Sequence, residues 1–202
     1  MHERGVEHSP CMNSPALRYT PVAIVLHWTI AAFILFNLSL GFFMEGFARP
    51  LKEIVVPLHI SSGMTILALT LLRILWRLSH RPPPLHADLL PWERAAAHGA
   101  HALLYVLMLA MTLTGWSIIS AHAPNPHGGP KYFGLFHLPP IGPLSQLEAT
   151  AQKAAHERFV ELHSIGAWIF LGLLALHVAG ALKHQLVDRH AELARMGLGR
   201  TR

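Results

Sequence analysis

Four stretches of the chain contain no Asp, Glu, Lys or Arg, and their length is the strongest constraint on the fold. They are Tyr19 to Met44, Ile54 to Leu72, Ala95 to Pro130 and Leu162 to Leu182. About 20 apolar residues in a helix span a hydrocarbon core of about 30 Å. Because each stretch is long enough, we expect four membrane-spanning helices, with the first over Val22 to Met44.

The composition supports a membrane protein and limits its chemistry. The chain is 52% hydrophobic and 13% charged, whereas soluble domains are about 25% charged. The apolar stretch after Arg18 is too long for a signal peptide and lacks a small-residue cleavage site. Cys11 is the only cysteine, which excludes an internal disulfide, a Cys-x-x-Cys-His haem attachment and a thiolate-bound iron–sulfur cluster.

The basic residues predict the orientation of the helices. With a cytoplasmic N-terminus, one side holds eleven Lys or Arg: Arg4, Arg18, Arg73, Arg77, Arg81, Arg94, Lys183, Arg189, Arg195, Arg200 and Arg202. The other side holds five, which are Arg49, Lys52, Lys131, Lys153 and Arg158. Cytoplasmic loops carry the excess of positive charge. We therefore expect an all-α integral membrane four-helix bundle with both termini cytoplasmic, and the net charge of +5 needs no nucleic-acid partner.

The segments between the apolar stretches define the expected organisation. Residues 1–17 form an N-terminal extension, 18–187 the four-helix domain, and 188–202 a basic cytoplasmic tail. The proline-rich sequence "SHRPPPLHADLLPWER" predicts a nonhelical turn between the second and third helices. The external segment 121–158 is broken by Pro and Gly until about Ser145, after which helix formers predict a surface helix running into the fourth spanning helix.

Sixteen histidines are present, and several lie inside the apolar stretches, where polar groups are costly and usually functional. The predicted helix directions convert sequence position into depth. His59 and His163 then lie near the outer face. The inner layer contains five candidates, which are His27, His98, His101, His177 and His184.

Neutral imidazoles from facing helices are suitable axial ligands for a b-type haem. His163 and His177 are separated by nearly four helical turns, an axial rise of about 21 Å, so one helix can serve two sites. The outer layer offers the single pair His59 and His163, whereas the inner pair is left open by spacing alone. Zinc fits poorly, because it requires three or four close ligands.

His163 and His177 are 14 residues apart, and the same 14-residue step relates other histidines to residues on their own helices. It places Gly41 and Gly115 at the depth of the outer site, where they leave room for a cofactor or let helices pack closely. It places Arg73 at the depth of the inner site, where it could pair with a haem propionate.

Together these features resemble the bacterial cytochrome b561 family of dihaem inner-membrane proteins. The matching sequences are "VLHWTI", "PLHISSG" followed by "LLRILWRL", "AHGAHALLYVLMLAMTLTGW", "LHSIGAW" and "LHVAGALKH". The resemblance implies two haem b groups, one bound by His27 and His177 and the other by His59 and His163. It also implies that His101 and His184 lie near the inner haem and a ubiquinone site.

The leading hypothesis is transmembrane electron transfer from a periplasmic donor to quinone in the bacterial inner membrane. Some similar proteins oxidise superoxide, and here Lys131, Lys153 and Arg158 could attract that anion. Others are membrane-anchor subunits that carry electrons for a separate periplasmic oxidoreductase. A third hypothesis is a haem-free metal or proton transporter.

Overall fold

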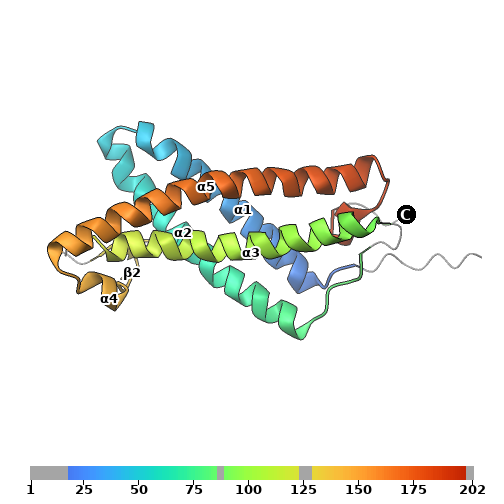
Figure 1. Cartoon of the computed structure of the whole chain (residues 1–202), viewed down its shortest axis with the longest axis horizontal. Helices are drawn as coiled ribbons and strands as arrows, with labels where there is room; N and C mark the ends of the chain where they lie inside the picture. Colours follow the sequence, from blue (N-terminus) through green and yellow to red (C-terminus); the bar gives the residue numbers. More distant parts are fainter. Residues whose placement is uncertain (1–17, 86–88, 123–128, 199–202) are drawn as a thin grey trace, which may run out of the picture.

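The computed structural model describes residues 18–85, 89–122 and 129–198 and is mainly helical (Figure 1). Its helices are α1 (Pro21–Phe43), the 3-10 helix η1 (Met44–Gly46), α2 (Arg49–Ser79), α3 (Pro91–Ser120), α4 (Gly142–Ser145), α5 (Ala149–Leu186) and α6 (Glu192–Arg195). The strands are β1 (Lys131–Tyr132) and β2 (Phe136–His137). Four helices, α1, α2, α3 and α5, are long and apolar enough to span a membrane. The predicted helical membrane fold and number of spanning helices are therefore confirmed, whereas the cytoplasmic position of both termini stays a prediction.

Local sequence signals begin these helices. The hydroxyl of Thr20 accepts a hydrogen bond from the Ala23 backbone N–H at 3.3 Å, and Pro21 occupies the first turn of α1. The Glu93 carboxylate accepts a hydrogen bond from the Leu90 N–H at 3.1 Å where α3 begins. The Glu148 carboxylate accepts a hydrogen bond from the Thr150 backbone N–H at 3.1 Å and so caps the start of α5. Each cap satisfies a backbone donor that the helix leaves unpaired.

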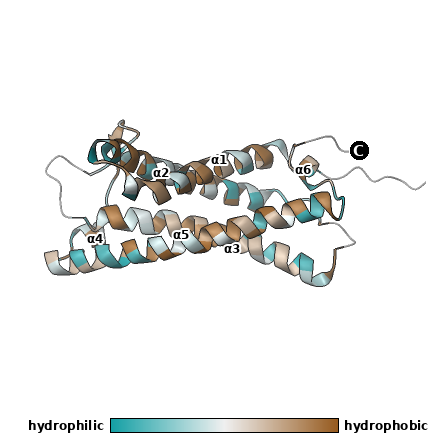
Figure 2. Cartoon of the chain, turned by 90° about the horizontal axis from the view of Figure 1, so that it is seen from above, coloured by the Kyte–Doolittle hydropathy of each residue, from teal (hydrophilic) through white to brown (hydrophobic). Residues whose placement is uncertain are grey.

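The helices pack as two pairs. Among the described residues, close backbone contacts join α1 with α2, α3 with α5 and α2 with α3, whereas α5 makes no comparable contact with α1 or α2. Figure 2 shows α3 and α5 side by side, with the brown apolar residues concentrated in the middle of the long helices. Large side chains fill the centre, where Ile30, Ile34, Ile66, Met108 and Phe170 form a buried cluster.

Helix α5 is much longer than a bilayer requires. Its 38 residues extend for about 57 Å, against a hydrocarbon core of about 30 Å. The first part carries Lys153, Glu157, Arg158 and Glu161, and the apolar part follows without a break. The predicted surface helix that runs into the fourth spanning helix is therefore confirmed.

A short hairpin on the loop between α3 and α5 was not predicted. Strands β1 and β2 pair antiparallel, with Lys131 opposite His137 and Tyr132 opposite Phe136. The turn uses two left-handed residues, Phe133 (φ 45°) and Gly134 (φ 78°). Ser61 fixes the hairpin on α2, because its hydroxyl accepts a hydrogen bond from the Phe133 N–H at 2.9 Å. The predicted nonhelical turn between α2 and α3 is confirmed for residues 80–85 and 89–90, but residues 91–94 are helical and form the first turn of α3.

The described part of the predicted tail folds back onto the bundle. Trp28 donates its indole N–H to the Met196 carbonyl at 2.8 Å. Arg195, only 3% exposed, donates to the Pro84 carbonyl at 2.6 Å. The Tyr19 N–H donates to the Arg195 carbonyl at 3.2 Å. Residues 1–17, including Cys11, and residues 199–202 lie outside the described residues, and the predicted domain boundaries stay a prediction.

Candidate haem-binding site

The two histidines expected at the outer face lie opposite each other. His59 belongs to α2 and His163 to α5, and their ring centroids are 6.1 Å apart. Two metal–nitrogen bonds of about 2 Å on opposite sides of an ion place two imidazole centroids roughly 6 Å apart. The spacing of this pair therefore fits two axial ligands of one haem iron.

Hydrogen bonds orient both outer rings. Nδ1 of His59 lies 3.1 Å from the backbone carbonyl oxygen of Asn37, to which only an N–H can donate. Nδ1 of His163 lies 3.0 Å from the hydroxyl oxygen of Thr114. The Thr114 hydroxyl donates to the Ala110 carbonyl at 2.8 Å, so its oxygen accepts from His163. Both rings thus carry the proton on Nδ1 and leave Nε2 for a metal, the arrangement that outer hydrogen bonds impose on ligating histidines.

Two glycines leave space for these rings. A Cβ on Gly41 would lie 3.1 Å from Cε1 of His59, and one on Gly115 would lie 3.3 Å from Cε1 of His163. Both distances are shorter than an ordinary van der Waals contact. The sequence predicted these glycines at the depth of the outer site, and the structure adds that they border the imidazoles themselves.

Three imidazoles meet toward the other end of the bundle. The ring centroids of His27 on α1 and His177 on α5 are 6.4 Å apart, which fits the same axial spacing. His101 on α3 is closer to His177, at 5.3 Å. His27 and His177 thus bring side chains of α1 and α5 together, although these two helices lack the close backbone contact that joins α2 with α3.

Arg73 is held near this inner group by neutral oxygens. Its Nε donates to the Tyr105 hydroxyl at 2.8 Å, and a terminal nitrogen donates to the Ala23 carbonyl at 3.1 Å. Ala23 lies one turn before His27 on α1. The structure therefore places Arg73 near the depth that the 14-residue step predicted, with its positive charge held by uncharged groups.

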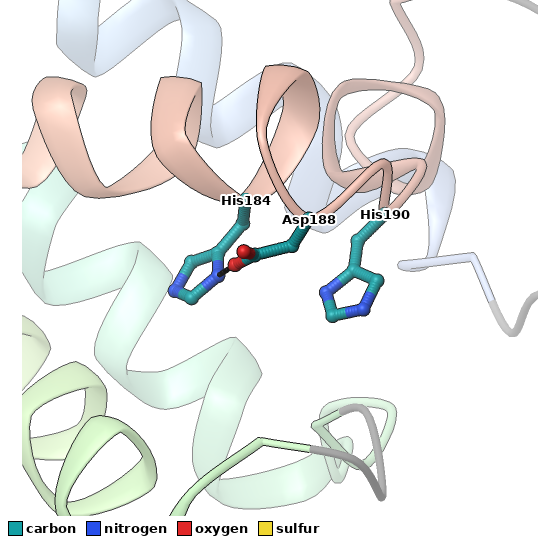
Figure 3. Close-up of side chains that lie close together, drawn as sticks. All are labelled: His184, Asp188 and His190. Carbon is teal, nitrogen blue, oxygen red and sulfur yellow. Dashed lines mark hydrogen bonds and ion pairs between the residues drawn. The ribbon is translucent and has the colours of Figure 1, made fainter.

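His184 belongs to a different cluster from His101. Its Nδ1 donates to the Asp188 carboxylate at 2.6 Å, and His190 stacks beside it with centroids 6.1 Å apart (Figure 3). The pKa of Asp188 is lowered, chiefly by a hydrogen bond from Lys183 and also by the one from His184. Lys183 in turn pairs with Glu93 at 2.5 Å, which joins α3 to α5.

The donor atoms of His184, Asp188 and His190 all lie within 4.8 Å of one another, as in a loose metal site. Two ligands of one zinc ion lie at most about 4 Å apart, and Lys183 already supplies a cation to Asp188 at 2.8 Å. This cluster thus fits an ion-pair network better than a metal centre. Asp188 was not predicted as the partner of His184, although their spacing of four residues at the end of α5 was a usable signal.

Acidic neighbours offset part of the positive charge expected at the outer surface. Lys153 pairs with Glu157 at 3.9 Å, and Arg158 pairs with Glu161 at 2.5 Å. These exposed pairs contribute little stability, but they reduce the local attraction for an anion. Lys131 belongs to the hairpin, and its backbone carbonyl accepts a hydrogen bond from the Ser61 hydroxyl.

Facing imidazoles on apolar helices that could span a membrane are typical of membrane-bound b-type cytochromes. The chain belongs to the prokaryotic cytochrome b561 family, whose model matches residues 18–199. Members of this family bind b-type haem and transfer electrons across the membrane, and the chain is accordingly a bacterial multi-pass membrane protein.

Three curated proteins show the range of its relatives. Cytochrome b561 homolog 2 of Escherichia coli K12 is 31% identical over 191 residues, covering 91% of this chain and 93% of its own. Cytochrome b562 of Cereibacter sphaeroides is 36% identical over 118 residues, covering 54% and 73%. The probable superoxide oxidase CybB of Yersinia pestis is 24% identical over 180 residues, covering 89% and 95%.

Proposed function

We propose that the chain binds two b-type haems, one between His59 and His163 near the outer side and one between His27 and His177 near the inner side. The observation that carries this proposal is the ring spacing of 6.1 Å and 6.4 Å in the two pairs. When bound, these haems would supply one-electron transfer between a donor at the outer face and quinone at the inner face.

The chain itself would position these groups and tune them. The Asn37 carbonyl and the Thr114 hydroxyl, which contact Nδ1 of the two outer histidines, would leave Nε2 of each ring available to hold the haem iron. Arg73 would pair with a propionate, because its guanidinium is already oriented by Tyr105. His101, beside His177, and His184, at the end of α5, would border the quinone site.

The outer pair lies close to the end of the apolar region. Glu161, the last charged residue before the apolar part of α5, precedes His163 by two residues, a rise of about 3 Å. A small donor such as superoxide could therefore approach the outer site directly, which supports a superoxide:quinone oxidoreductase. Both termini would be cytoplasmic and the host bilayer the inner membrane, as the distribution of basic residues predicts.

The hairpin favours a second candidate, a subunit that accepts electrons from a separate periplasmic oxidoreductase. Leu135 and Phe136 expose 77% and 55% of their surface at its tip. Exposed apolar residues at the tip of a hairpin are suited to contact with a partner protein. Copurification with a periplasmic redox protein, lost in a Leu135→Ser variant that keeps its haems, would favour this candidate.

Spectroscopy of the purified chain tests the haem assignment. We expect two haems per chain, with His59→Ala and His27→Ala each losing a different one. His98→Ala, on an exposed part of α3, is the control and should keep both. Two haems in either ligand variant would refute the pairing, and a spectrum without b-type bands would favour a haem-free transporter.

Stopped-flow mixing with superoxide distinguishes superoxide from a periplasmic oxidoreductase as the electron donor. Reduction of the outer haem faster than spontaneous dismutation would support the oxidase. No reduction above that background would leave the partner-fed subunit as the function.

A further inference from the structure

A cavity of about 220 Å³ opens between the start of α1, the last turns of α2 and the middle of α3. Four arginines line it, which are Arg18, Arg73, Arg77 and Arg81, and no Asp or Glu does. Arg73 is half-buried, and the other three are exposed. The cavity is thus a basic pocket between membrane-spanning helices.

The positive charge of this pocket is not neutralised within the described part of the chain. None of the four arginines forms an ion pair with a described carboxylate. Arg73 donates to the neutral oxygens of Tyr105 and Ala23, and the guanidinium of Arg77 lies 5.9 Å from the centre of the Tyr105 ring. Like charges gathered beside a low-dielectric membrane repel one another, so a bound anion would stabilise the pocket.

The lining indicates which anion fits. Guanidinium groups match the oxygens of phosphate through paired hydrogen bonds. Trp76 and Tyr19 also line the cavity, and these residue types prefer the level of lipid head groups. Basic pockets between membrane helices bind anionic lipid head groups. A neutral quinone ring would leave the charges of Arg18, Arg77 and Arg81 uncompensated, even with Arg73 paired to a haem propionate.

The pocket lies at the last turns of α2, a helix that is long and apolar enough to span a membrane. A phospholipid whose head group enters the pocket would keep its acyl chains in the surrounding hydrocarbon. We propose that this pocket binds a phosphate group, supplied by an anionic phospholipid.

The test is lipid retention by the full haem-loaded chain in detergent, measured by native mass spectrometry. After delipidation, the protein is titrated with phosphatidylglycerol or with phosphatidylcholine. We expect preferential retention of phosphatidylglycerol, reduced roughly ten-fold in an Arg18→Gln/Arg81→Gln variant. The control, Arg49→Gln/Lys52→Gln, removes the same charge from the other end of α2 and should leave retention unchanged.

Two further measurements keep the outcome clear. The haem spectrum of each variant reports whether the chain is folded, and Arg18→Lys/Arg81→Lys should restore part of the retention. Competition by millimolar inorganic phosphate would support the phosphate site and assign it to a soluble phosphate rather than a lipid. Equal retention of the two lipids, or equal losses in the test and control variants, would overturn the proposal without touching the haem assignment.

Discussion

Replacing Thr114 with Val tests how the chain orients the His163 imidazole. Valine keeps the shape of threonine but lacks the hydroxyl oxygen that lies 3.0 Å from Nδ1 of His163. The replacement therefore removes a hydrogen-bond acceptor from a ring that we propose binds haem iron. It leaves the helix intact, because the Thr114 hydroxyl donates only to carbonyls of its own helix.

The size of the effect follows from this lost contact. Removing an outer hydrogen bond to a metal-binding histidine lowers metal affinity about 10- to 100-fold. The Met111 carbonyl also approaches the His163 ring and can replace part of the interaction. We therefore expect a loss near ten-fold, or about 1.4 kcal/mol. A less basic imidazole also raises the reduction potential of the outer haem.

The measurement is haem loss to an excess of a haem-scavenging protein, combined with a redox titration. Thr112→Val is the matched control, because the Thr112 hydroxyl also donates to a helix carbonyl, that of Met108 at 2.9 Å. Thr114→Val should release one haem faster and raise one potential, whereas Thr112→Val should do neither. Identical release rates and potentials in the two variants would refute the proposed role of Thr114.

Two further predictions follow from other contacts. Gly41→Ala places a Cβ 3.1 Å from the His59 ring, and Gly172→Ala meets nothing within 4 Å. Both changes gain up to about 1 kcal/mol of helix propensity, but the crowding at Gly41 costs about 1–3 kcal/mol. Only Gly172→Ala should therefore raise the midpoint of thermal unfolding, measured by circular dichroism. Equal midpoints would contradict this. The pKa of Asp188 is lowered, chiefly by the hydrogen bond from Lys183. The ionised carboxylate therefore stabilises the fold at pH values above the ordinary aspartate pKa, and this stabilisation is lost as the pH falls through the lowered pKa. Asp188→Asn should therefore lower the midpoint at neutral pH and not in strong acid; an equal loss at both would be inconsistent with that linkage.

The sequence predicted most of the framework because membrane insertion imposes length and charge rules. Apolar length located the four spanning helices, and helix direction converted the position of each histidine into depth. That conversion brought His59 to the level of His163 before any packing was known. It could not choose among the inner histidines, because depth does not say which face of a helix a side chain occupies.

The contacts that orient the proposed haem-binding histidines could not be predicted from the sequence for the same reason. Asn37 and Thr114 contact histidines on other helices, and their contribution depends on the rotation of each helix about its axis. The hairpin was missed because its strands have only two residues each, too few for an alternating pattern. The return of the tail onto Trp28 likewise depends on a long-range contact.

The wide spacing between α5 and the α1–α2 pair has a consequence for biogenesis. Without close backbone contact there, the proposed haem ligands would add a second link between the two halves to the one that α2–α3 packing provides. The free energy of haem binding would then become part of the free energy of folding. A ligand present at a hundred times its dissociation constant stabilises the native state by about 2.7 kcal/mol. Haem supply would then influence how much newly made chain escapes proteolysis.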